Sequence, residues 1–278
     1  RVLFASERYE EALGLLDGKD VWSQLAADIL KTTHVHEGHC LVLGLVEGRL
    51  VEELLRQSEL KVIAIDSDKK TIDLLRDRLV AAGLYGNRAE ALVGDLTTLH
   101  LPPYIAGLVV SETQGGTQLA AHVPVAQLVG WLRPYGGVAC LEATTSEQDE
   151  LSGWLAKGDL ENVQASRVGG WLLLRRVGAL PGSTHWTHEC ADAARTYFSH
   201  DERVKAPLGV LWYGDGPDHG FKKHKDYHAG VKPQVVNGAL VAFDDGAKRL
   251  RAYDVYTGRV LWETSADPFT RFASMPDG

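Results

Sequence analysis

Residues 39 to 66 constrain the fold of this chain more than any other segment. An apolar run, Cys40 to Leu45, leads through a short loop with two glycines into the amphipathic stretch Arg49 to Gln57. A second apolar run then ends on an acid, Asp66. Strand, tight turn, helix, strand and carboxylate in this order are typical of the first half of a nucleotide-binding sheet.

The loop between these two strands carries the residues expected to face a ligand. Gly44 and Gly48 let the backbone approach where a Cβ atom would collide. Asp66 stands where a carboxylate accepts hydrogen bonds from ribose hydroxyls. Val46 departs from the pattern, because such loops usually carry a middle glycine there, and its side chain is expected to point towards a bound ligand.

Alternating helix and strand signals continue to residue 176. Helices are predicted at 21–31, 69–82 and 123–132 and after Ser146, and strands at 89–93, 107–110, 138–143, 162–167 and 171–176. The last two strands flank Gly169-Gly170 and read as an antiparallel hairpin. We therefore predict a Rossmann-like, doubly wound α/β sheet with a reversed last strand, whose ligand crevice lies at the carboxyl ends of the strands.

The pattern changes near residue 179, after which helical periodicity disappears. Short strands are predicted at 208–213, 234–236, 239–243, 249–253 and 259–263. Asn237-Gly238 and Thr257-Gly258 have the composition of hairpin turns. Antiparallel strands with short turns indicate a second, all-β domain.

Composition limits the class of partner. The chain has 278 residues, 45% of them hydrophobic and 24% charged, as in folded soluble proteins of one or two domains. Its net charge of −8 argues against a nucleic-acid partner. No apolar stretch reaches the roughly 20 residues of a membrane span. The chain opens on Arg1, so we expect a processed or excised piece.

Cysteine usage indicates neither a disulfide framework nor a Cys-rich metal site. The three cysteines are far apart in sequence, and Cys40 and Cys140 fall on strands separated by another strand, so both are expected to be free and buried. Histidines gather in the second half, at positions 185, 188, 200, 219, 224 and 228. Metal ligation is one interpretation of this group. Polar linker residues are the favoured one.

Four motifs in the first 178 residues agree with one known family. They are LVLGLVEGRL, VIAIDSD, LVGDL and LVVSE, in this order. Residues of about 20 to 178 thereby resemble a class I S-adenosylmethionine-dependent methyltransferase domain. The closing antiparallel hairpin agrees with that family and not with the all-parallel sheet of dinucleotide dehydrogenases.

The resemblance implies a set of cofactor-binding residues. The loop would contact the methionine part, the acid after the second strand the ribose, the next loop the adenine, and the end of the fourth strand would close the crevice. These residues are, in the same order, Gly44, Leu45, Val46 and Gly48; Asp66 and Ser67; Asp95 and Leu96; Ser111 and Glu112. No catalytic residue stands out after the fourth strand.

Each acidic residue in this set has a structural alternative. Asp66 could instead cap the following helix, Asp95 after a glycine could form a turn, and Glu112 could be a solvated strand end. Pro102-Pro103-Tyr104 resembles part of a motif with which amine methyltransferases hold a target nitrogen. It precedes the fourth strand and lacks the asparagine, so a rigid turn is predicted there.

The second half resembles another family. Residues 252–263, AYDVYTGRVLWE, are similar to the repeat of quinoprotein-type β-propellers, in which an Asp, a Thr-Gly turn and a Trp close each blade. We therefore predict a methyltransferase-like domain at 1–178, a linker at 179–205 and a truncated first blade at 206–278. The remaining blades would come from the full-length protein or another chain, and pyrroloquinoline quinone would bind only a complete propeller.

The combination resembles large multidomain bacterial proteins of planctomycete type. Their joining segment is matched by His185-Trp186-Thr187-His188, with Asp192 and Asp201 downstream. The leading hypothesis is methyl transfer from S-adenosylmethionine to a small-molecule or protein acceptor, with S-adenosylhomocysteine as product, in the cytoplasm. The alternative is a catalytically silent scaffold joined to a propeller that binds ligands or does redox chemistry in the periplasm or outside the cell.

Overall fold

The computed structural model describes residues 20–113, 116–158, 160–212, 233–244 and 248–265. The chain divides into two compact units between Val177 and Gly178. Some residues named in the sequence analysis lie outside the described residues. They are Arg1, Tyr213, His219, His224 and His228.

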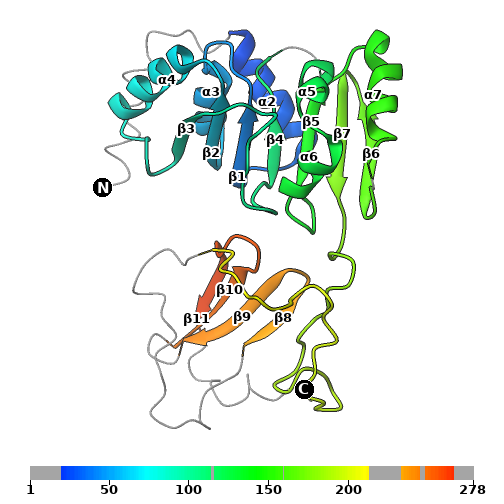
Figure 1. Cartoon of the computed structure of the whole chain (residues 1–278). Helices are drawn as coiled ribbons and strands as arrows, with labels where there is room; N and C mark the ends of the chain where they lie inside the picture. The colour runs from blue at the N-terminus through cyan, green and yellow to red at the C-terminus, as the bar shows by residue number, and fades with distance from the viewer. Residues whose placement is uncertain (1–19, 114–115, 159, 213–232, 245–247, 266–278) are drawn as a thin grey trace. The chain divides into compact units, whose positions relative to one another are not determined.

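The first unit is built on a seven-stranded sheet of order β3-β2-β1-β4-β5-β7-β6 (Figure 1). Its strands are β1 (Glu37–Leu43), β2 (Glu59–Asp66), β3 (Ala89–Val93), β4 (Leu108–Val110), β5 (Val138–Glu142), β6 (Val163–Val168) and β7 (Trp171–Arg176). The first five are parallel, and β7 runs antiparallel to both β5 and β6. The predicted doubly wound sheet with a reversed last strand is confirmed.

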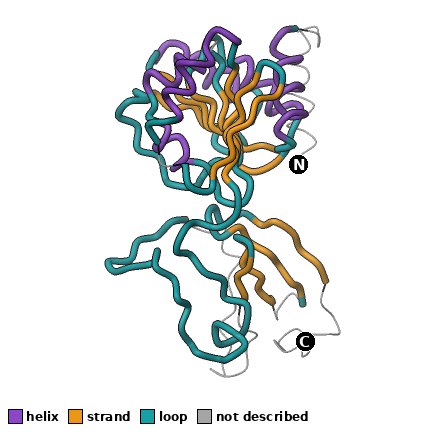
Figure 2. Tube along the Cα trace, turned by 90° about the vertical axis from the view of Figure 1, so that its right-hand side faces the viewer, coloured by secondary structure: helices purple, strands orange, loops and turns teal. Residues whose placement is uncertain are grey.

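Helices cover both faces of this sheet (Figure 2). One face carries α2 (Val21–Thr33), α3 (Arg49–Gln57) and α4 (Lys69–Ala81), and the other carries α5 (Gly116–His122), α6 (Val125–Trp131) and α7 (Gln148–Leu155), which follows the 3₁₀ turn η1 (Thr145–Glu147). Residues of β1 alternate between the two cores, Cys40 and Val42 facing the first and Leu41 and Leu43 the second. A central strand buried on both faces explains the continuous apolar run in the sequence.

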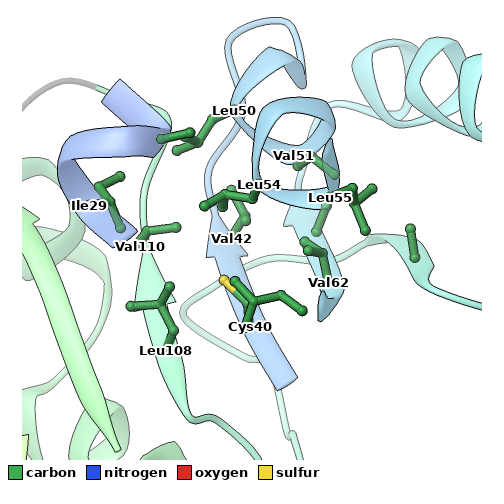
Figure 3. Packing of buried hydrophobic residues seen from close by; sticks show 14 of the residues in the cluster. Ile29, Cys40, Val42, Leu50, Val51, Leu54, Leu55, Val62, Leu108 and Val110 are labelled. Atoms are coloured by element: carbon green, nitrogen blue, oxygen red, sulfur yellow. The ribbon is translucent and has the colours of Figure 1, made fainter. Parts of the chain in front are cut away.

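The core under α3 fixes the helix that follows the glycine loop. Leu50 and Leu54 are fully buried in the same cluster as Val42 and Cys40 of β1, with Leu54 beside Val42 (Figure 3). Burial of each such leucine contributes about 1.5–3 kcal/mol. Because α3 is held in this way, the loop that precedes it has a defined end point.

Two helices of the second face differ from prediction. The helix expected from residue 123 begins at Val125 with Pro124 in the N-cap position. Ser146 does not cap α7, because the chain first forms η1 and Glu147 takes the cap position. The Glu147 carboxylate accepts hydrogen bonds from the amide and hydroxyl of Thr144, which closes this turn before the α-helix starts.

The cysteines behave as expected from their strands. Strand β4 lies between β1 and β5 and so separates Cys40 from Cys140, and both thiols are free and buried. Burial raises the pKa of the Cys140 thiol to about 12. It raises the pKa of Cys40 as well, with a further contribution from the neighbouring Cys140.

We expect neither Cys40 nor Cys140 to react with a thiol reagent in the native protein at pH 8. Burial keeps both groups protonated and out of contact with solvent. Mass spectrometry after labelling in buffer and in denaturant measures this, with the same two residues in the unfolded chain as the control. Labelling in buffer at the unfolded-state rate would contradict the prediction.

The second unit contains a four-stranded antiparallel sheet of order β11-β10-β9-β8. Its strands are β8 (Gln234–Val236), β9 (Ala239–Asp244), β10 (Arg249–Asp254) and β11 (Val260–Ser265). Asn237 and Gly238 both have positive φ, 49° and 75°, as a two-residue hairpin turn requires. A meander of this kind occurs in many all-β folds, and it establishes a separate antiparallel sheet.

The prediction of a strand at 208–213 is wrong for the residues that the structure describes, because 208–212 form no strand. Trp212 instead packs through its side chain, and its indole N–H donates to the Val255 carbonyl at 2.8 Å. The ring lies against Gly258, where a Cβ atom would be 2.1 Å from it. Within this segment Trp212 is held by side-chain packing, whereas Leu208, Val210 and Leu211 are exposed.

Candidate functional site

Residues that follow four parallel strands meet at the carboxyl edge of the sheet. The Gly44 amide donates to the Ile65 carbonyl at 2.9 Å, and the Gly94 amide donates to the Asp66 carbonyl at 2.9 Å. The Glu112 amide donates to the Gly44 carbonyl at 3.2 Å. These bonds continue the strand pairing by one step and place the loops after β1, β2, β3 and β4 side by side.

Both glycines of the loop after β1 are required by its backbone. Gly44 and Gly48 each have φ of +78°, in the left-handed region. A Cβ atom on Gly44 would lie 3.1 Å from the Thr113 hydroxyl, and one on Gly48 would lie 3.0 Å from Leu75 Cδ1. Val46 is 51% exposed, so a large part of its side chain is in solvent.

Glu112, which follows β4, is buried against this loop. Glu112 is 2% exposed. The alternative prediction, a solvated strand end, is therefore wrong. The Val46, Glu47 and Gly48 amides donate to Oε2 at 2.7, 3.1 and 2.7 Å, and the Leu50 amide donates to Oε1 at 2.8 Å. Helix α3 starts after Gly48, which has no side-chain cap, and Glu112 accepts hydrogen bonds from the Gly48 and Leu50 amides at this helix end.

Asp66, at the end of β2, contacts the same loop. Its Oδ2 accepts a hydrogen bond from the Leu45 amide at 2.7 Å, and its Oδ1 accepts one from the Asp68 amide at 2.7 Å. The N-cap of α4 is Asp68, which accepts from the Lys70 amide, so the capping role considered for Asp66 is wrong. A carboxylate has about four acceptor positions, and two such bonds leave capacity for hydroxyl donors. Ser67 beside it is exposed.

Asp95, after β3, forms the turn predicted as its structural alternative. Its Oδ1 accepts hydrogen bonds from the Thr97 amide and hydroxyl, both at 2.8 Å. These bonds lower the pKa of Asp95, which is an exposed residue. Leu96 is half-buried against the second core. The Ser111 hydroxyl lies 2.7 Å from that of Thr113, above Gly44.

Buried charges behind the loop were not predicted from the sequence. Glu52 of α3 is 4% exposed and forms ion pairs with Arg49 at 2.9 Å and with Arg78 of α4 at 2.5 Å. Arg78 also donates to the Glu47 carbonyl within the loop, and Arg49 pairs with Asp20 at 2.6 Å. Oppositely charged residues three apart, such as Arg49 and Glu52, were the available signal. The network ties α2 and α4 to the loop.

Other residues singled out in the sequence lie elsewhere or form no site. Pro102-Pro103-Tyr104 precedes β4 and is a turn, as predicted, with the Arg176 guanidinium 5.2 Å from the centre of the Tyr104 ring. His185 and His200 are exposed. Within the described residues no group of three or more His, Cys, Asp or Glu could hold a metal ion. No helix among those same residues is long and apolar enough to cross a membrane.

Comparisons with known proteins identify the fold of the first unit. No model of a protein family matches the sequence, and no curated protein matches it. A solved structure from Methanococcus maripaludis, named as a proposed S-adenosyl-L-methionine-dependent methyltransferase, is 14% identical and aligns over 64% of this chain and 94% of its own, with a TM-score of 0.50. The first unit has the class I methyltransferase fold.

A second solved structure, a SAM-dependent methyltransferase from Aquifex aeolicus, is 15% identical with a TM-score of 0.43. It aligns over 61% of this chain and 98% of its own length. In the first unit, the mixed sheet with its antiparallel β7 matches the fold of the structure from Methanococcus maripaludis. The sheet of the second unit lies outside it.

Proposed function

We propose that the first unit binds S-adenosylmethionine and transfers its methyl group to a small-molecule or protein acceptor, leaving S-adenosylhomocysteine. The observation that supports this most is the contact between Asp66 and the glycine loop, through the Leu45 amide, on a sheet of methyltransferase order. An acid after β2 beside a loop after β1 is the arrangement that holds a nucleoside at the switch point of such a sheet.

The residues present fit the nucleoside half of this cofactor. Asp66 retains acceptor capacity for two ribose hydroxyls, and the turn at Asp95 and Leu96 would lie against the adenine. Gly44 and Gly48 supply the left-handed backbone that shapes the loop. The bound cofactor supplies an activated methyl group on a sulfonium, so the residues of the chain need chiefly to align the acceptor and exclude water. Ser111 and Thr113 are hydroxyl groups at this edge that could orient an acceptor.

A second candidate function is supported by the hydrogen bonds that the loop amides already make within the chain. Amides of the loop already donate to carboxylates of the chain itself, Asp66 and Glu112. In this proposal the first unit is a catalytically silent scaffold, and the second unit carries binding or redox function. The first proposal predicts a cytoplasmic protein, and the second a periplasmic or exported one.

The second unit would then be the first blade of a quinoprotein-like propeller, at 206–278 after a linker at 179–205. Its support is the four-stranded antiparallel sheet and the turn after β10. Asp254 is 1% exposed and accepts from the Tyr256 amide at 3.0 Å, and the Gly258 amide donates to the Asp254 carbonyl at 2.8 Å. Further blades would come from the full-length protein or another chain, and pyrroloquinoline quinone would require all of them.

Calorimetry with S-adenosylhomocysteine on the purified chain separates the two proposals. Saturable binding supports the methyltransferase. Absence of binding at millimolar ligand would sink it and favour the scaffold.

Asp66→Ala is expected to weaken S-adenosylhomocysteine binding at least tenfold, which is about 1.4 kcal/mol. The substitution removes the carboxylate proposed to accept both ribose hydroxyls. Titration calorimetry measures the dissociation constant, and circular dichroism checks the fold.

Asp68→Ala is the matched control for this variant. Asp68 is an acid two residues further on, but its side chain caps α4 instead of facing the loop. Affinity should therefore remain within about twofold of the parent chain. Equal affinity of Asp66→Ala and the parent would refute the ribose assignment.

A further inference from the structure

The backbone amides of the glycine loop all donate to acceptors within the chain. The Gly44 amide is bound by a strand carbonyl, the next amide by Asp66, and four more by the single carboxylate of Glu112. Those four belong to Val46, Glu47, Gly48 and Leu50. The donors that would otherwise bind an external anion at the start of α3 are thus already satisfied.

The Glu112 carboxylate contacts the loop through both of its oxygens. Its Oε2 accepts hydrogen bonds from three amides and its Oε1 from one. These four bonds hold the carboxylate against the loop. Its negative charge lies at the positive end of α3, where a bound phosphate sits in many nucleotide-binding proteins.

Further negative charge surrounds the same loop. Glu47 lies within the loop and is exposed, and the Asp66 carboxylate is 2.7 Å from the Leu45 amide. An incoming phosphate would meet three acidic side chains and amides that already have acceptors. Arg78, whose guanidinium contacts the Glu47 carbonyl, is already paired with Glu52. Hydrogen bonding and electrostatics therefore both disfavour an anionic ligand group there.

We propose that Glu112 is a specificity-determining residue that permanently occupies the anion position of the loop. It closes the loop to ligands that must place a phosphate there, nucleoside diphosphates and dinucleotides above all. A second consequence rests on the proposed function. If the first unit binds S-adenosylhomocysteine, the carboxylate of that ligand is held by groups other than these amides.

Backbone amide exchange measured by NMR on the whole chain tests whether the position is occupied. The Gly48 and Leu50 amides should exchange at least 100-fold more slowly than the Thr97 amide, which donates to the exposed Asp95 carboxylate. Comparable exchange rates for the three amides would overturn the proposal, because the Glu112 carboxylate would then not hold the loop.

Titration with inorganic pyrophosphate tests the exclusion. The parent chain and Glu147→Ala, which removes a carboxylate outside the loop, should show no perturbation of the Gly48 and Leu50 resonances. Glu112→Ala should gain at least tenfold in pyrophosphate affinity. If that variant does not fold, Glu112→Gln, which keeps one acceptor oxygen, should gain about threefold. Binding at these amides in the parent chain, or no gain in a folded variant, would overturn the proposal.

S-adenosylhomocysteine provides a separate arm of the same experiment. Where it binds, resonances near Asp66 should move while those of Gly48 and Leu50 stay within the range of distant residues. Large shifts of these two amides would mean that the ligand displaces Glu112, against the proposal. If S-adenosylhomocysteine does not bind, the proposal of methyl transfer fails. The pyrophosphate titrations still decide the role of Glu112 in that case.

Discussion

Glu112→Ala is expected to lower the free energy of unfolding of the first unit by about 3–5 kcal/mol. The carboxylate is 2% exposed and accepts from four amides, of which those of Gly48 and Leu50 belong to buried residues. Each buried donor left without an acceptor costs about 1–3 kcal/mol. Loss of an ordinary helix cap costs about 0.5–2 kcal/mol, so this variant should exceed it.

Denaturant unfolding followed by the helical circular dichroism signal measures this loss, since the described helices all belong to the first unit. Glu147→Ala is the matched control. Its carboxylate accepts from the Thr144 amide and hydroxyl and the Thr117 hydroxyl, but it is only partly buried. We expect at most about 1 kcal/mol there. Equal losses of unfolding free energy in the two variants would show that the bonds from the loop amides to Glu112 add no special stability.

Gly48→Val is expected to destabilise the first unit by about 2–5 kcal/mol. The left-handed backbone at φ of +78° costs a side chain about 1–2 kcal/mol. The added atoms would also enter a space in which Leu75 Cδ1 is 3.0 Å and Arg78 Nη2 3.1 Å from the Cβ position. Overpacking of this kind costs about 1–3 kcal/mol.

Gly83→Val separates the two contributions. Gly83 also has a left-handed backbone, with φ of +68°, but no atom lies within 4 Å of its Cβ position. Unfolding experiments on both variants should show a loss for Gly48→Val that is larger by at least about 1 kcal/mol. A difference near zero would mean that Leu75 and Arg78 move aside and that the loop tolerates a side chain.

The sequence was sufficient for the parts of the site that depend on local pattern. The run from Cys40 to Asp66 alternates strand, turn and helix signals within 27 residues, and each signal is strong by itself. Glycines at two positive-φ positions and an acid at the strand end follow from the same segment. These features could be predicted because neighbours in the chain produce them.

The role of Glu112 could not be predicted in the same way. Its contacts to the loop join residues 62 to 66 positions apart, and they exist only because β4 lies next to β1. A glutamate at a strand end has no local signal for burial. Only the order of strands in the sheet places its side chain beneath the amides of α3.

Helix α5 was missed for a different reason. It begins at Gly116, and glycine disfavours helix by about 1 kcal/mol relative to alanine. In the structure Gly116 is buried, and a Cβ atom there would lie 2.9 Å from the Glu142 carbonyl oxygen of β5. The residue that weakens the local helix signal is the one that lets this helix pack closely on the sheet.

Helix α4 is joined to both parts of the candidate site. At its start, the amide of its cap residue Asp68 donates to Asp66, and near its end Arg78 donates to the Glu47 carbonyl of the loop. One rigid element thus sets the spacing between the carboxylate and the loop before any ligand arrives. A nucleoside that binds there should lose little affinity to ordering of the protein, so that its association should resemble a rigid fit rather than coupled folding.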